Sequence, residues 1–192
     1  MRFLAILTAL FFGVTSLFAV IEKDAIGKTM KQKIDIVTAI LQDKNIAKES
    51  LKSRIFELFD PVFDYALMAK LSLGPVEWKK LSEEQQQTFT MLFEHKLKSS
   101  YADKLDLYTD EVVAIKEVKP VKSHIFLFTE LIGKETNYKI YDAKEKGWLI
   151  YDVDILGVSI IKTYRSQFSG ILQKQPFDAL IELLKQPETV SQ

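Results

Sequence analysis

Apolar residues recur at spacings of three and four over the first half of the chain, which is the period of an amphipathic α-helix. In residues 21–43 this stripe faces away from a row of lysines and consists of Ile26, Met30, Ile34, Val37 and Leu41. Shorter helices are predicted over residues 49–59 and 61–74, and a further helical turn containing Trp78 follows Pro75. The pattern therefore predicts a helical N-terminal half.

Several residues mark where these helices begin and end. Asp60 followed by Pro61 is typical of an N-cap and a first helical position, and Gly74 is a typical C-terminal stop. Ser82 and Gln85 have the spacing of a capping box, so a long helix is predicted to begin there. Its apolar stripe consists of Phe89, Leu92, Phe93 and Leu97.

After Tyr108 the apolar period changes to two, the period of a β-strand. Four strands are predicted, at residues 111–119, 121–132, 135–142 and 148–155, and residues 144–147 have a hairpin-turn composition. Two amphipathic helices close the chain, one carrying Ile161 and Phe168 and the other following Pro176. This order predicts an α+β fold, with an antiparallel meander of about four strands and about seven helices.

One predicted strand is apolar on both faces. Residues 125–128 read Ile-Phe-Leu-Phe, and successive side chains of a strand point to opposite faces of its sheet. A sheet that is covered on one face only would alternate apolar with polar residues. Either helices cover both faces, or one face of the sheet lines an apolar cavity.

The first nineteen residues have the composition of a secretory signal peptide. Arg2 precedes an uncharged, mostly apolar run from Phe3 to Phe18, and Ala19 is a small residue suited to cleavage. At about 16 residues the run is shorter than the ~20 that a membrane-spanning helix needs. We therefore expect residues 1–19 to be removed and residues 20–192 to form a single domain.

Charge and cysteine content narrow the class of protein. Removing residues 1–19 takes away one arginine and no acid, so 25 basic and 26 acidic residues remain, a net charge of −1. This balance gives no sign of a nucleic-acid-binding surface. The chain has no cysteine, so neither disulfides nor a lipoprotein attachment point are expected. A soluble periplasmic protein is the class that fits.

The chain offers few groups for catalysis or metal binding. Its two histidines, His95 and His124, form no metal-ligand spacing, and there is no glycine-rich phosphate loop. Asp152 and Asp154 share one face of a strand, opposite an apolar face formed by Tyr151, Val153 and Ile155, and are expected to face solvent or a cationic partner. Lys96 lies within the apolar stripe of the long helix, where it either snorkels to solvent or faces a lipid phosphate at a cavity mouth. We predict a protein that is not an enzyme and that has no cofactor and no metal.

Two stretches of the chain resemble a known family. The first is Phe-Asp-Tyr-Ala-Leu-Met-Ala at residues 63–69, with Leu73, Gly74 and Trp78 after it and Phe89, Phe93, Leu97 and Tyr101 further on. The second is Tyr-Asp-Val-Asp-Ile-Leu-Gly-Val-Ser at residues 151–159, followed by Tyr-Arg-Ser-Gln-Phe at residues 164–168 and by Ile171 and Leu172. In order and spacing they resemble the MlaC, or toluene-tolerance, family of periplasmic phospholipid-binding proteins. Pro75, directly after Gly74, departs from the family pattern.

The resemblance implies a carrier with a curved antiparallel sheet, a helical cover and a deep apolar pocket for the acyl chains of a phospholipid cargo. It also implies partners: an inner-membrane ABC transporter complex with an MCE-domain ring and, often, an outer-membrane lipoprotein complex. The expected function is to shuttle lipid between these complexes and so maintain outer-membrane lipid asymmetry. Apolar faces and family motifs together nominate eleven lipid-binding residues: Phe63, Leu67, Trp78, Phe89, Phe93, Leu97, Tyr101, Tyr151, Val153, Ile161 and Tyr164.

Two other classes of function remain open from the sequence. One is an envelope adaptor module without a lipid of its own. The other is a small isomerase or dehydratase on a similar cone-shaped α+β fold, which would need a histidine or carboxylate with a perturbed pKa inside a pocket. A large internal apolar cavity distinguishes the carrier from the adaptor.

Overall fold

The computed structural model describes residues 24–43, 45–105, 113–131 and 133–186. Residues 24–42 are helical. The elements that follow are α2 (Lys48–Phe59), the 3₁₀ turn η1 (Asp60–Val62), α3 (Tyr65–Leu73), α4 (Pro75–Lys80), α5 (Glu83–Leu105), β1 (Ala114–Val121), β2 (His124–Leu131), β3 (Lys134–Asp142), η2 (Lys144–Lys146), β4 (Trp148–Ile155), β5 (Val158–Ser159), α6 (Ile160–Leu172) and α7 (Phe177–Lys185). The predicted signal peptide, residues 1–19, and two predicted strand ends, Glu111 and Ile132, lie outside the described residues. None of the described helices combines the length and apolar composition that crossing a bilayer requires.

The five strands form one open antiparallel sheet in the order β1-β2-β3-β4-β5, which confirms the α+β prediction. The fifth strand was not predicted, because its two residues are too few to show an alternation. The turn between the first two strands also lies at a different position from the predicted one. Pro120 was predicted to separate two strands, but it lies within β1, and the chain turns at Lys122 and Ser123. β1 is an edge strand, where a proline is tolerated.

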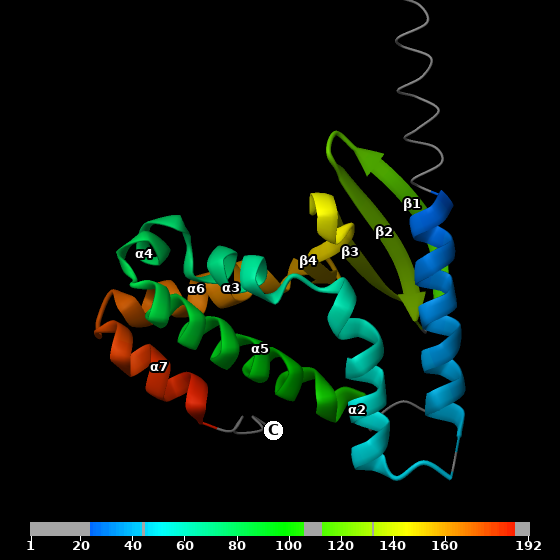
Figure 1. Ribbon diagram of the computed structural model, residues 1–192, viewed down its shortest axis with the longest axis horizontal. Helices are drawn as coiled ribbons and strands as arrows, with labels where there is room; N and C mark the ends of the chain where they lie inside the picture. Colours follow the sequence, from blue (N-terminus) through cyan, green and yellow to red (C-terminus); the bar gives the residue numbers. More distant parts are fainter. Residues whose placement is uncertain (1–23, 44, 106–112, 132, 187–192) are drawn as a thin grey trace, which may run out of the picture.

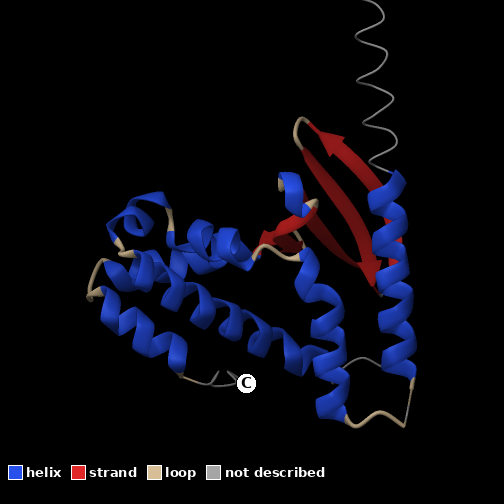
Figure 2. Cartoon of the chain, viewed as in Figure 1, coloured by secondary structure: helices blue, strands red, loops and turns tan. Residues whose placement is uncertain are grey.

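The helices form two groups around the sheet (Figure 1 and Figure 2). α3 to α7 pack together on one side, and α2 and the helix over residues 24–42 stand next to the strands. Ile26 and Met30 of the first helix belong to the same buried cluster as Ile125 and Ile140 of the sheet. The approach is close at Gly27, where a β-carbon would lie 3.2 Å from Cγ2 of Val118.

The strand that is apolar on both faces is β2. Ile125 and Leu127 are buried, 3% and 0% exposed, on the face that the first helix covers. Phe126 and Phe128 are half-buried on the opposite face, and their rings stack with centroids 6.4 Å apart. The sheet face that carries Ile125 and Leu127 continues across β3 and β4, where it lines the cavity described below.

Of the two helix N-caps predicted from the sequence, the structure confirms one and places the other at a different residue. In the capping box, the Ser82 backbone N–H donates to Gln85 Oε1 at 2.9 Å, and the Gln85 N–H donates to Ser82 Oγ at 3.2 Å. Asp60, the predicted cap of the helix ending at Gly74, instead begins the 3₁₀ turn. The cap is Asp64, whose Oδ1 accepts from the Leu67 N–H at 2.8 Å, because Phe63 is extended and separates the two segments.

Candidate functional site

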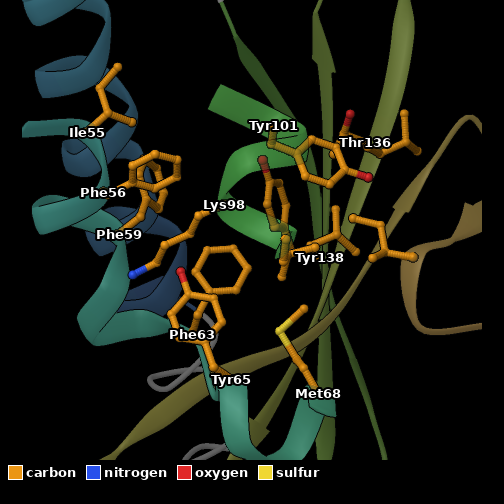
Figure 3. A pocket seen from close by; sticks show the side chains of 14 residues that line it. Ile55, Phe56, Phe59, Phe63, Tyr65, Met68, Lys98, Tyr101, Thr136 and Tyr138 are labelled. Carbon is orange, nitrogen blue, oxygen red and sulfur yellow. The ribbon is translucent and has the colours of Figure 1, made fainter. Parts of the chain in front are cut away.

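An apolar cavity of about 260 Å³ lies between α2, the C-terminal half of α5 and one face of the sheet (Figure 3). Aromatic and aliphatic side chains from six elements and from Phe63 make up most of its wall, which consists of Ile55, Phe56, Phe59, Phe63, Tyr65, Met68, Leu97, Lys98, Tyr101, Thr136, Tyr138, Val153, Ile155 and Ile160. Burial raises the pKa of the Tyr138 hydroxyl, which therefore stays protonated at neutral pH. We call this space the apolar cavity.

The charged residue in the wall of the apolar cavity is Lys98, and its ammonium group is paired with two carboxylates. Its Nζ lies 2.6 Å from Asp60 Oδ2 and 2.6 Å from Glu94 Oε1, and it stands 4.9 Å from the centroid of the Tyr65 ring. Burial lowers the pKa of Lys98, but its hydrogen bonds to the two carboxylates outweigh this and raise the pKa above its usual value. Burial and a hydrogen bond to Asp60 raise the pKa of the Tyr65 hydroxyl as well. Neither group is poised to act as a base near neutral pH.

A second, more polar cavity of about 420 Å³ adjoins the first. It shares Tyr101, Ile155 and Ile160 with the apolar cavity, and its remaining wall consists of Lys96, Ser100, Val158, Thr163, Tyr164 and Gln167. The hydroxyl oxygens of Ser100 and Tyr164 lie 3.3 Å apart. We call this space the polar vestibule. The two neighbouring spaces thus differ in chemistry, the first apolar and the second richer in hydrogen-bonding groups.

Comparison with known proteins assigns the chain to a family. A model of the MlaC protein family matches residues 31–186, most of the chain. The chain belongs to the MlaC family. The binding protein MlaC of the intermembrane phospholipid transport system of Haemophilus influenzae is 27% identical to it over 118 residues. That alignment covers 57% of this chain and 55% of the relative, so the chain spans about half the length of the curated relative it matches.

A solved structure shares the MlaC-family fold. It is a phospholipid-binding protein from Ralstonia solanacearum, determined in complex with a phospholipid, and it matches with a TM-score of 0.71 at 23% sequence identity. The match covers 82% of this chain and 93% of that protein. This likeness supports the α+β architecture deduced from the sequence, with its antiparallel sheet and helical cover.

Four of the eleven nominated residues lie in the wall of the apolar cavity: Phe63, Leu97, Tyr101 and Val153. Tyr101 also lines the polar vestibule, as does Tyr164. The MlaC-family motifs thus contribute to both spaces. Whether these side chains contact a lipid stays a prediction.

The other nominated aromatic residues of the helical layer lie in a packed cluster and line neither space. Phe89 and Phe93 are 0% exposed, and their ring centroids lie 6.2 Å apart. Trp78 contacts Phe89 edge to face, with centroids 6.3 Å apart. Ile161 is buried in the same core, and Leu67 is half-buried on α3 outside the lining of either space. The helical stripe correctly marks a buried face, but most of that face packs against other helices.

Tyr151 lies on the opposite side of the sheet from the place predicted for it. A β-bulge shifts the register between Lys139 and Ile140, so that Tyr151 is an extra residue and the alternation along β4 is interrupted. Its ring packs edge to face against His124 and Tyr141, with centroids 5.5 and 5.8 Å away. The prediction that Tyr151 shares the apolar face of Val153 is therefore wrong.

The two aspartates of β4 have a structural partner. Lys139 Nζ lies 2.8 Å from Asp152 Oδ2 and 2.8 Å from Asp154 Oδ1, which confirms the predicted cationic partner. His95 is exposed, and His124 lies beside Tyr151. Within the described ranges, no group of three or more metal-ligating residue types is close enough to hold an ion.

Sequence reasoning missed much of the cavity wall. Phe56 and Phe59 of α2, Met68 of α3, and Thr136 and Tyr138 of β3 all line it. The amphipathic stripe of residues 49–59 was a usable signal for α2, because it showed an apolar face that needed a partner. Nothing in the local pattern showed that this partner is β3, which lies about eighty residues further along the chain.

Proposed function

We propose that this chain binds a phospholipid by its acyl chains in the apolar cavity and carries it through the periplasm. The observation that carries this proposal is the apolar cavity itself, in a chain of the MlaC family. Ligand sites typically span roughly 300–1,000 Å³. The apolar cavity, about 260 Å³, lies just below this range, and the neighbouring polar vestibule, about 420 Å³, lies within it. Support for the cargo comes from the relatives, one of which is named for phospholipid transport and another of which holds a phospholipid.

Energetics explain the need for such a carrier. Two acyl chains hold ~30 methylene-type groups, and at ~0.8 kcal/mol each their exposure to water costs on the order of 25 kcal/mol. A lipid therefore does not cross an aqueous compartment unaided. An apolar cavity replaces the bilayer with a similar medium, so that transfer from membrane to protein is close to neutral. The carrier by itself therefore does not determine the direction of lipid transfer, and its partner complexes do.

The partners we propose are an inner-membrane ABC transporter complex with an MCE-domain ring and an outer-membrane lipoprotein complex, between which the lipid is shuttled to maintain outer-membrane asymmetry. The name of the Haemophilus influenzae relative, which places it in an intermembrane transport system, supports this assignment. We propose a carrier and not an enzyme, because the chain belongs to a family with a relative named for transport, and because Lys98, the charged residue in the cavity wall, is paired with Asp60 and Glu94.

Organic extraction of the purified protein followed by mass spectrometry tests the proposal. We expect a two-chain phospholipid to be recovered in an amount comparable to that of the protein. An exported protein without a lipid cavity, purified in parallel from the same cells, controls for lipid carried over from the membrane. No lipid above that control would favour the adaptor and overturn the carrier.

We also propose that residues 1–19 are a cleaved signal peptide and that residues 20–192 form the single mature domain. The short apolar run from Phe3 to Phe18 after Arg2 supports this. N-terminal sequencing of the exported protein should give a start at Val20. A membrane-bound form that retains Met1 would contradict cleavage.

A further inference from the structure

The apolar cavity and the polar vestibule are neighbouring spaces that differ in polarity. Three residues line both: Tyr101, Ile155 and Ile160. A molecule with long apolar chains and a polar end matches these two neighbouring spaces in chemistry, with its chains towards α2 and its polar end towards the vestibule. If the chain carries a phospholipid, as proposed above, its head group has two possible exits: past Lys98 or through the vestibule.

Charge disfavours the exit past Lys98. That lysine is held by Asp60 and Glu94, each 2.6 Å from its Nζ, so the cluster of three side chains carries a net negative charge. A phosphate placed there would face two carboxylates and would have to compete with them for the one cation. An anionic group is repelled from this end of the cavity.

The vestibule has the opposite charge balance. Among the described residues that line it, Lys96 carries the only formal charge. Its Nζ lies 3.4 Å from the backbone oxygen of Gln186, and no described carboxylate forms an ion pair with it. Gln167 adds a side-chain amide, a donor suited to phosphate oxygens. The hydroxyl groups of Ser100 and Thr163 already donate to the backbone oxygens of Lys96, at 2.8 Å, and of Ser159, at 2.9 Å. The wall thus offers a cation and an amide to an anion, and no carboxylate to a second cation.

We propose that the polar vestibule holds the phosphodiester of the lipid head group, with Lys96 as its cationic contact, and that the site therefore prefers anionic phospholipids to zwitterionic ones. The head group of phosphatidylglycerol contains the phosphodiester anion and no cation, so Lys96 can balance its negative charge. Phosphatidylethanolamine brings an ammonium group that finds no carboxylate in the wall of the vestibule. The inference rests on the proposed carrier function and specifies where its cargo sits and which head group it favours.

A competition experiment with the mature chain tests this. The protein, delipidated, is incubated with vesicles of equimolar phosphatidylglycerol and phosphatidylethanolamine, re-isolated and extracted, and both the total lipid and the ratio of the two lipids are measured. Wild type should capture phosphatidylglycerol in excess. Lys96→Gln should keep most of the total lipid but lower the ratio about ten-fold, the scale of one hydrogen bond to a charged group. Lys96→Arg should retain the preference.

Lys162→Gln is the matched control, because Lys162 is exposed on α6 and lies outside the lining of the vestibule. Its lipid ratio should equal that of wild type. A ratio that is unchanged in Lys96→Gln, or that falls equally in Lys162→Gln, overturns the assignment to Lys96 while the carrier function stands. If millimolar inorganic phosphate alone abolishes the preference, the vestibule is a site for free anions and the proposal fails. If wild type takes up no lipid at all, the proposed function itself fails.

Discussion

Leu97→Glu should leave the folded protein with less than about a tenth of the phospholipid that the proposed carrier function gives the wild type. Leu97 is 6% exposed and lines the apolar cavity, so the new carboxylate would point into the space where we propose that the acyl chains lie. Burying an unpaired charge against hydrocarbon costs more than ~2 kcal/mol, whereas the empty cavity can admit water around it. Lipid content after organic extraction and thermal melting by circular dichroism measure the two effects separately.

Two variants control for this result. Leu97→Met conserves volume and apolar character and should keep its lipid. Met91→Glu places the same charge on the same helix at a position that is 64% exposed, and should change neither lipid content nor melting temperature. Unchanged lipid in Leu97→Glu would show that Leu97 does not contact the cargo. A variant that simply unfolds would show that Leu97 is an ordinary core residue.

Asp152→Ala should destabilise the fold by about 3 kcal/mol, because a buried carboxylate with several partners is lost. Asp152 is 5% exposed. It accepts from the backbone N–H groups of Val153 at 2.9 Å and Ile161 at 3.2 Å, from Ser159 Oγ at 2.7 Å and from Lys139 Nζ at 2.8 Å. It therefore joins β3, β4, β5 and the first turn of α6. Urea denaturation monitored by circular dichroism measures the loss.

Asp154→Ala is the matched comparison, since both carboxylates lie 2.8 Å from Lys139 Nζ. The Asp154 side chain is 21% exposed, and we expect its removal to cost about 1 kcal/mol or less. The difference between the two variants then reports the bonds that Asp152 makes to Ser159 and to the backbone. Equal losses would mean that the ion pair with Lys139 carries the stabilisation and that the link to α6 adds nothing.

The elements of the fold follow from local patterns in the sequence. A period of three to four residues identified the long helix, Ser82 and Gln85 marked its first turn, and alternation identified four of the five strands. Each of these signals acts between residues a few positions apart, where helix and strand geometry alone decide which side chains share a face. The order of the elements then led to the α+β class, and the family motifs led to the expected cavity.

The wall of that cavity was decided only by the tertiary structure. Periodicity shows that a face is apolar, but packed core and cavity wall need the same residue types. Phe93 and Leu97 lie one helical turn apart on the same apolar stripe of α5. The sequence therefore could not show that Phe93 is packed core and that Leu97 lines the cavity. The bulge that turns Tyr151 to the other side of the sheet depends on how β4 pairs with β3, which no single strand reveals. The same holds for charge. Lys96 and Lys98 are two residues apart, yet only the folded chain brings Asp60 to Lys98 and leaves Lys96 in the vestibule, because that contact joins residues 38 positions apart.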